Sequence, residues 1–224
     1  MLFRSVNQTR VDGQGEKLPT ELQETQSYKT ILRQGIQAFK DHTILQYLAF
    51  DLIGFSAISW IFYWIFQLTL DHLAIPLQYW GIINTGAILG HIGLLNSVKI
   101  WEKMGNSKKS ILVISGLTLS LSSLLCAIFI NTVWVCIVCI ILGMAFGPIR
   151  APLLNSYMNK YIASEQRATV LSLVSMIDRA FLMIFNLIMG AFAEDHLRIA
   201  YLTLAILGFF ILLFSQVKES HLQD

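Results

Sequence analysis

The chain has 224 residues, of which 55% are hydrophobic and only 13% charged, and its mean hydropathy is +0.61. Because an average soluble domain is about 25% charged, this composition excludes an ordinary water-soluble protein. A formal net charge of +2 gives no sign of a nucleic-acid partner, since nucleic-acid-binding domains are usually strongly basic. The composition therefore indicates an integral membrane protein whose main partner is the lipid bilayer.

The first segment, residues 1–42, is polar. Residues 5–28 are rich in Gln, Glu and Thr and contain too little apolar surface to fold alone, so we expect a cytoplasmic segment without a core. From Tyr28 onward, apolar residues recur at helical spacing beside Lys and Arg, which predicts either an amphipathic helix at the membrane surface or a solvated lead-in. Met1 is followed closely by Arg4 with no apolar run between, so no cleavable signal peptide is expected.

Six apolar stretches follow, each long enough to cross a hydrocarbon core of about 30 Å as a helix. We expect them at about 43–68, 79–100, 110–130, 133–156, 168–193 and 199–217. The predicted fold is an all-α integral membrane protein: a six-helix transmembrane bundle over residues 43–217, followed by a cytoplasmic tail at 218–224.

The basic residues are distributed unequally between the connections. Thirteen of the 16 Lys and Arg residues fall before the first span, in the second and fourth connections, or after the last span. The opposite side has only Arg198, while Arg150 and Arg179 lie within spans. By the positive-inside rule both termini are cytoplasmic, and we expect a multi-pass protein of the plasma (inner) membrane.

Motifs for metal, cofactor or nucleotide chemistry are missing from the sequence. Cys126, Cys136 and Cys139 include a Cys-x-x-Cys pair, but it lies in an apolar run without a nearby His to complete a zinc site. We interpret these cysteines as small apolar filler and predict no metal and no cofactor. There is also no Walker loop, dinucleotide fingerprint or His-Glu-x-x-His, so we do not expect an enzyme.

Two G-x-x-x-G motifs predict close approach of neighbouring helices. One consists of Gly86 and Gly90 and the other of Gly143 and Gly147. Glycine lets helix backbones approach closely where lipid provides little hydrophobic driving force. We interpret both motifs as packing sites.

Pro148 and Pro152 flank Arg150 in the fourth span. A proline removes a backbone donor and bends a helix, so we expect a kink near the cytoplasmic end. For Arg150 we favour a side chain that reaches the cytoplasmic interface over one that contacts a solute.

Several short motifs occur in the order and spacing of a known family. They are YWIFQ at 63–67, WGII at 80–83, RATVLS at 167–172 and GAFAED at 190–195. These segments resemble the seventh, eighth and eleventh helices of a major facilitator superfamily transporter. The resemblance extends over about 43–217 and corresponds to the C-terminal half of a twelve-helix fold.

The second connection carries Glu102, Lys103, Gly105 and Lys108. It resembles the cytoplasmic Asp-Arg-x-Gly-Arg loop of the same superfamily, with Glu102 in place of the aspartate. The resemblance implies a cytoplasmic gating loop here.

The resemblance also implies a missing partner. In this family the solute path lies between two six-helix halves, so one half needs a second six-helix half or a second copy of itself. The polar segment before Tyr28 then corresponds to the family's central loop. The sequence is compatible with three explanations: a truncated gene product, a separately encoded half, or a homodimer. It favours the truncated gene product.

The function implied by the resemblance is transport of a small-molecule solute by alternating access, driven by a proton or sodium gradient. The alternative is a membrane scaffold or signalling subunit that keeps the fold without transporting. A six-span channel or membrane-embedded enzyme comes third.

Asp178 and Arg179 are the main candidates for the functional centre. They follow Arg167 by 11 and 12 residues, which at 1.5 Å per residue places them about 16–18 Å into the bilayer, near its middle. Adjacent helical residues point about 100° apart, so we expect the two side chains to have different partners.

Arg179 belongs to a polar stripe whose members share one helix face, namely Ser172, Ser175, Arg179, Asn186 and Gly190. This stripe suits a water-filled cavity, in which Arg179 contacts an anionic group of the solute or a carboxylate across the path.

Asp178 shares its face with the apolar Val174, Leu182 and Phe185, so we expect it to be buried against another span. It either positions Arg179 or carries a proton. The structural alternative is an ion pair between helices.

Five further polar residues are solute-binding or coupling candidates. Tyr63 and Gln67 share one helix face, as do Asn84 and His91. The alternative for each is a polar group satisfied by a neighbouring helix. Asp51, about a third of the way into the first span, requires a partner, water or a proton.

Overall fold

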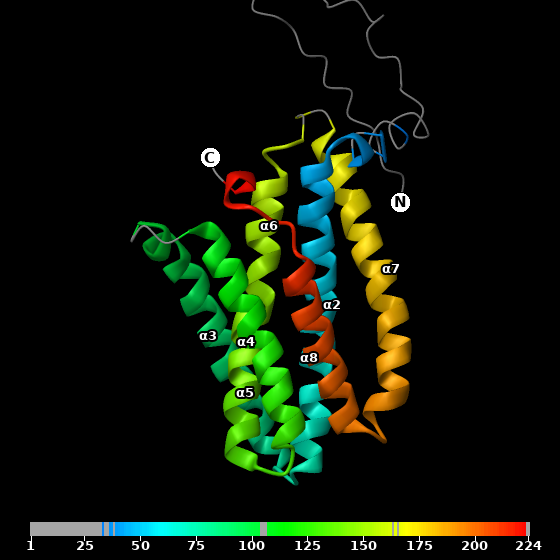
Figure 1. Cartoon of the computed structure of the whole chain (residues 1–224). Helices are drawn as coiled ribbons and strands as arrows, with labels where there is room; N and C mark the ends of the chain where they lie inside the picture. The colour runs from blue at the N-terminus through cyan, green and yellow to red at the C-terminus, as the bar shows by residue number, and fades with distance from the viewer. Residues whose placement is uncertain are drawn as a thin grey trace, which may run out of the picture.

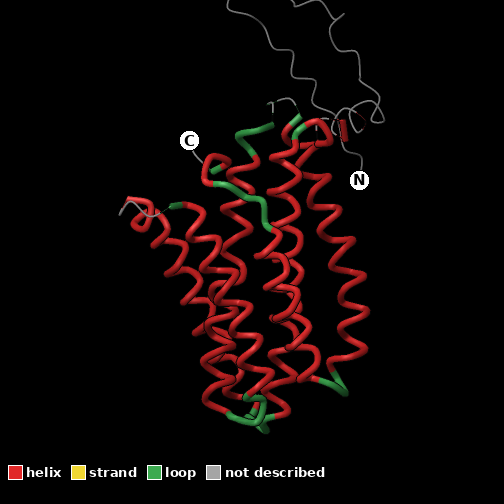
Figure 2. Tube along the Cα trace, viewed as in Figure 1, coloured by secondary structure: helices red, strands yellow, loops and turns green. Residues whose placement is uncertain are grey.

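The computed structural model describes residues 33, 36–37, 39–103, 107–162, 164 and 166–222, with the backbone alone at 99 and 101–103. Within these residues the regular secondary structure is all helical, with turns and loops between the helices and no strand (Figure 2). The expected amphipathic segment after Tyr28 lies mostly outside the described residues.

Six candidate membrane spans are present in the described chain, as the apolar stretches predict. The helices are α2 (Thr43–His72), α3 (Leu77–Lys103), α4 (Lys108–Ile128), α5 (Val133–Phe146), α6 (Arg150–Met158), α7 (Arg167–Ala193) and α8 (Leu197–Phe214). The fourth span combines α5 and α6. The last helix ends at Phe214, earlier than the expected end at 217, and the chain continues as a tail.

Helix α2 occupies the middle of the bundle, where it packs against α6, α7 and α8, while α4 lies between α5 and α8 (Figure 1). Helices α3 and α7 stand at opposite edges. In α2 and in α4, 56% of the most apolar stretch is buried inside the bundle. In α3 and in α7 the buried share of this stretch is only 17%. The two edge helices therefore leave most of their surface uncovered.

The fourth span is interrupted at η2 (Gly147–Ile149), a short 3-10 turn between α5 and α6. Pro148 cannot donate a backbone hydrogen bond, so the regular helix is broken there. The break lies where the kink is predicted. It also makes Arg150 the first residue of α6.

Glycines allow the close packing in part of the bundle. A Cβ at Gly143 would lie 2.6 Å from the ring of Phe62, and one at Gly90 would lie 3.3 Å from the Ala145 Cβ. Gly147 is similarly close to Ser59. The prediction that Gly86 is a packing site is wrong within this bundle, because no atom of a neighbouring helix lies within 4 Å of the position of an added Cβ. It lies on an edge helix that the bundle does not cover.

The tail after α8 folds back over the end of the bundle. Val217 and Leu222 are buried there, and the Tyr161 hydroxyl donates a hydrogen bond of 2.8 Å to the carbonyl of His221. Glu219, in η3 (Glu219–His221), accepts hydrogen bonds of 2.9 Å from the backbone N–H groups of Lys108 and Lys109. The tail thus connects α8 to the beginning of α4.

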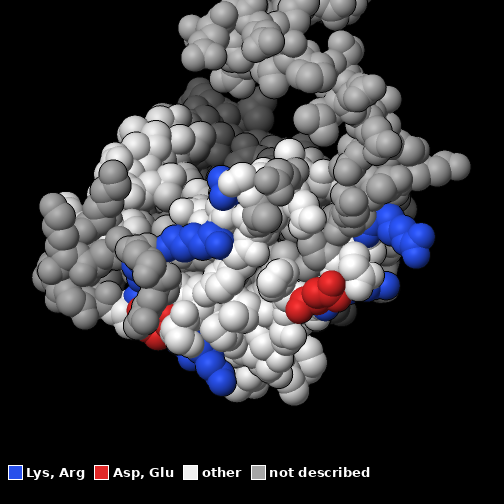
Figure 3. Space-filling model, turned by 90° about the horizontal axis from the view of Figure 1, so that it is seen from above, with Lys and Arg blue, Asp and Glu red and all other residues white. Residues whose placement is uncertain are grey.

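The start of α2 and the end of α8 lie at the same end of the bundle, as six spans require (Figure 1). Figure 3 looks onto this end and shows Lys and Arg side chains on the face and around its rim, with fewer acidic ones. The opposite end has Asp71, Glu194 and Asp195, with Arg198 at the start of α8. The two ends therefore differ in charge.

Candidate functional site

A cavity of about 540 Å³ lies between α2, α6 and α7, next to the η2 turn. Its polar and aromatic lining consists of Ser56, Ser59, Trp60 and Tyr63 from α2, Arg150 and Asn155 from α6, and Ser175, Asp178 and Arg179 from α7. A cavity with a few polar groups and an apolar remainder has the usual character of a small-molecule site. Because α7 is poorly covered, the cavity lies on an open side of the bundle.

The α7 wall follows the two faces that helical spacing predicts. Asp178 is half-buried beside Ser56 of α2, and its Oδ1 atom is buried without a hydrogen-bond partner. Arg179 is exposed, and its guanidinium carbon lies 5.8 Å from the centre of the Trp60 ring. The buried Val174 shares the face of Asp178. The two charged side chains therefore have different surroundings, as expected.

The α2 wall is aromatic and hydroxylic. The rings of Trp60 and Tyr63 meet edge to face with centroids 6.1 Å apart, a favourable geometry for aromatic pairs. Ser59 and Ser56 lie about one and two turns before Tyr63 and line the same cavity. This wall offers apolar surface and hydrogen-bonding groups side by side.

The α6 wall holds Arg150, which is only 3% exposed. Its guanidinium forms an ion pair with Asp51, donates a 2.6 Å hydrogen bond from Nη1 to the carbonyl of Leu112, and lies 3.8 Å from the Phe55 ring centre. The prediction that Arg150 reaches the cytoplasmic interface is wrong. Asp51 on the adjacent helix provides a partner at the same depth, so the guanidinium remains inside.

Asp51 is fully buried behind the cavity wall and does not line the cavity. The pairing supplies the partner that a carboxylate in a span requires. Two polar atoms of this pair, Asp51 Oδ1 and Arg150 Nε, are buried without a hydrogen-bond partner. The ion pair therefore leaves unused hydrogen-bonding capacity next to the cavity.

Two smaller hollows continue the polar stripe along α7. One of about 440 Å³ is lined by Arg179 and Asn186, and one of about 270 Å³ by Asn186, Gly190 and, from α2, Gln67. Arg179 and Asn186 each line two neighbouring hollows. The stripe thus follows the groove between α2 and α7 beyond the main cavity.

The structure separates the polar candidates on α3 from this groove. The Nδ1 atom of His91 lies 3.0 Å from the carbonyl oxygen of Ala145 on α5, within hydrogen-bonding distance. Asn84 has its Oδ1 buried without a partner and lines none of the hollows along α7. Tyr63, Asp178 and Arg179 are therefore brought together, whereas Asn84 and His91 belong to another part of the bundle.

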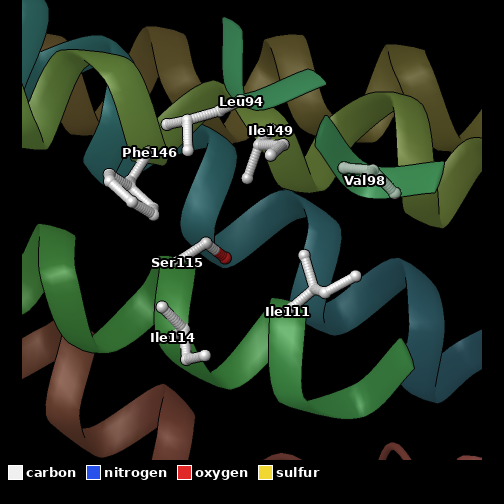
Figure 4. A pocket seen from close by; sticks show the side chains of 7 residues that line it. All are labelled: Leu94, Val98, Ile111, Ile114, Ser115, Phe146 and Ile149. Carbon is white, nitrogen blue, oxygen red and sulfur yellow. The ribbon is translucent and has the colours of Figure 1, made fainter. Parts of the chain in front are cut away.

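A second pocket lies between α3, α4 and the junction of α5 with η2. Figure 4 shows that aliphatic and aromatic side chains surround it, with Ser115 as its polar residue. The Ser115 hydroxyl already donates a 2.9 Å hydrogen bond to the carbonyl of Leu112. This pocket offers no free polar group of the lining to a solute, so we do not assign it to the site.

The expected gating loop is only partly described. Gly105 and the side chains of Glu102 and Lys103 lie outside the described residues. Lys108 begins α4, where its backbone N–H contacts Glu219. The described part of this loop is thus attached to the C-terminal tail.

The three cysteines cluster at the other end of the bundle. The thiol of Cys126 lies beside those of Cys136 and Cys139, and all three are buried and free of disulfides. Among the described residues no group of three His, Cys, Asp or Glu side chains has the arrangement of a metal site. Packing accounts for their position.

A family model described as Major Facilitator Superfamily matches residues 2–185, more than four fifths of the 224 residues. The chain belongs to the major facilitator superfamily. The matched segment includes every residue that lines the main cavity. Comparison with curated proteins and with solved structures gives no match.

Membership of the major facilitator superfamily and the six apolar helices make this an integral multi-pass membrane protein of a transporter family. Four cavity residues, Tyr63, Ser175, Asp178 and Arg179, were expected from the sequence, whereas Trp60 and Arg150 were not assigned to the site. For Arg150 the signal was present, because a second buried charge in another span is the natural partner for Asp51. Trp60 gave no signal in the sequence.

Proposed function

We propose that this chain is the C-terminal six-helix half of a major facilitator transporter and moves a small solute by alternating access. The single observation that supports this best is the cavity of about 540 Å³ between α2, α6 and α7. It combines charged, hydroxyl and aromatic side chains at the middle of the spans, on the side where α7 is least covered. A buried polar surface of this kind is typical of a solute path.

A second six-helix unit covers the open side in this proposal. The uncovered surfaces of α3 and α7 carry glycines with free space around them, at Gly81, Gly86 and Gly93 on α3 and Gly190 on α7. Small residues let another helix approach closely in a membrane. The second unit is either a separately encoded half or a second copy of this chain.

We further propose that Asp178 couples transport to a proton gradient. Its Oδ1 atom has no hydrogen-bond partner, and the residue lines the cavity. In this proposal the carboxylate exchanges its proton with water on one side of the membrane at a time. Arg179, on the exposed face of α7, contacts the solute. Both residues lie near the middle of their span, where charged groups usually serve a function.

The orientation follows from charge. The end that carries the start of α2, the tail and the basic rim faces the cytoplasm, because Lys and Arg favour the cytoplasmic side. The plasma (inner) membrane is the proposed location.

Uptake into proteoliposomes loaded with a pH-sensitive dye tests the proposal. A panel of sugars, amino acids, organic acids and amines is added outside, and a solute that enters with protons acidifies the interior. Asp178→Asn should abolish the acidification while solute exchange without a gradient continues. Asp195→Asn, at an exposed carboxylate outside the cavity, should behave like the parent protein. If no solute in the panel moves, the chain is not a transporter by itself.

A further inference from the structure

We propose that the main cavity binds a small organic carboxylate, which accepts hydrogen bonds from Arg150 in the wall and from Arg179 at the mouth. This inference rests on the proposed transport function and names the class of its solute. It starts from the Arg150 Nε atom, which is buried, has no hydrogen-bond partner and belongs to a residue that lines the cavity.

Arg150 is held in place before any solute arrives. Asp51 binds one of its terminal nitrogens, the carbonyl of Leu112 accepts from the other, and the Phe55 ring lies 3.8 Å from the guanidinium carbon. A side chain fixed on three sides loses little entropy when it binds a ligand. The remaining Nε–H is therefore a preorganised donor, and hydrogen bonds from a charged donor to a carboxylate are among the strongest in proteins.

Arg179 supplies the second donor group. It is exposed at the cavity and forms no ion pair with any other described residue. The Trp60 ring, 5.8 Å from its guanidinium carbon, supports the planar group from one side. The edge of this guanidinium is consequently available to a carboxylate.

The charge around the cavity favours an anion over a cation. The charged residues of its described lining are two arginines and Asp178. Asp51 neutralises Arg150 from behind, and Asp178 sits beside Ser56 on the α2 side of its helix. In the proposed coupling Asp178 carries a proton, and the guanidinium of the neighbouring Arg179 is then the uncompensated charge that a solute carboxylate meets at the mouth.

The walls require more of the solute than a negative charge. Trp60, Tyr63 and Pro148 present apolar surface, and Ser59 and Asn155 present hydrogen-bonding groups. The volume of about 540 Å³ lies within the usual range of about 300–1,000 Å³ for organic ligands. An organic acid with an apolar or aromatic body matches this lining better than an inorganic anion does.

Binding of radiolabelled benzoate to the purified chain in lipid nanodiscs tests the proposal, with benzamide and benzylammonium as competitors of nearly the same shape. Benzoate should bind saturably, and neither the neutral nor the cationic competitor should displace it. Arg179→Gln and Arg150→Lys should each weaken binding by about tenfold or more, because each removes a charge-assisted hydrogen bond to the carboxylate. Arg198→Gln, at an exposed arginine outside the cavity, should bind like the parent.

Arg150→Lys keeps a positive charge beside Asp51, although it changes a buried residue. Arg179→Gln changes an exposed residue, so it tests the proposal even if the Arg150→Lys variant fails to fold. The proposal is overturned by absence of saturable benzoate binding, by equal competition from benzamide, by stronger binding of benzylammonium, or by an Arg179→Gln variant that binds like the parent. Uptake of a neutral or cationic solute that depends on Asp178 would refute the proposal that the solute is a carboxylate, but it would support the transport function. Benzoate binding without uptake of any solute would support the carboxylate site and refute the transport function.

Discussion

The carboxylate of Asp51 on α2 and the guanidinium of Arg150 on α6 form an ion pair in the interior of the bundle. Asp51 is completely buried, and Arg150 is 3% exposed. The pair connects two neighbouring helices that both line the main cavity. It therefore contributes to the shape of the cavity as well as to the stability of the fold.

Removing one partner of this pair should be more harmful than removing both. Asp51→Asn or Arg150→Met leaves a buried charge without its counterpart, which we expect to cost about 3–5 kcal/mol of unfolding free energy. The double variant buries neither charge and should lose much less than the sum of the two single losses. Reversible unfolding in detergent mixtures gives the three values and their coupling. Additive losses would show that the two side chains act independently.

Glu219 should stabilise the attachment of the tail to the start of α4 in a pH-dependent way. Desolvation alone would raise the pKa of Glu219, but hydrogen bonds from Ser107 and the backbone N–H groups of Lys109 and Lys108, together with the Lys108 charge, hold it below the usual 4.5. A lowered pKa means that the stabilisation is complete above about pH 4.5 and is lost as the pH falls through the lower value.

Glu219→Gln should therefore lower the thermal unfolding midpoint at pH 7 and have little effect in strong acid. A helix N-cap contributes about 1 kcal/mol, which corresponds to about 2–4 °C for a chain of this size. Thermal scans of parent and variant between neutral and acidic pH measure this difference. Glu194→Gln, at an exposed residue at the other end of the bundle, is the control. A gap that stays constant down to strong acid would contradict the assignment to the ionised carboxylate.

Much of the fold could be predicted because it depends on local properties of the sequence. The length and hydropathy of each stretch determine a span, and Pro148 determines where the fourth span is interrupted. The neighbours of each helix could not be predicted in the same way. Nothing local shows that α2 lies in the middle or that α3 stands at the edge, since these depend on how six apolar helices fit together.

The candidate site could be predicted where one helix carries it and not where several helices meet. Periodicity separated the faces of Asp178 and Arg179 correctly, because both lie on α7. The pairing of Asp51 with Arg150 spans 99 residues of sequence and depends on the packing of α2 against α6. For the same reason, spacing alone gave no indication that Asn84 and His91 lie away from the α7 groove.

Topology can be checked with reporter fusions after Lys109 and after His196. These residues lie at opposite ends of the bundle, near the start of α4 and just before α8. The basic rim around the first of them predicts a cytoplasmic reporter there and an external reporter at the second. A phosphatase fusion, active outside, and a fluorescent fusion, bright inside, give complementary signals. Signals from the same compartment at both sites would remove the six-span topology.

Two glycines allow the internal packing of the bundle to be compared with its uncovered edge. At Gly143 a new Cβ would lie 2.6 Å from the fully buried Phe62 ring, whereas at Gly86 nothing lies within 4 Å. Gly143→Ala should cost about 1–3 kcal/mol because the core cannot expand freely. Gly86→Ala should be neutral or stabilise the chain by up to about 1 kcal/mol through helix propensity. Unfolding of both variants in detergent measures the contrast.

A larger side chain at Gly86 tests whether a second unit closes on α3. Gly86→Leu should unfold at the parent's midpoint in detergent, because its side chain enters open space in the isolated bundle. In proteoliposomes it should reduce solute uptake, since a bulky residue prevents another helix from approaching α3 closely. Leu213→Ala, at a residue 82% exposed on α8, serves as a surface control. Undiminished uptake by Gly86→Leu would mean that α3 faces lipid in the working protein, and that the second unit covers α7 alone.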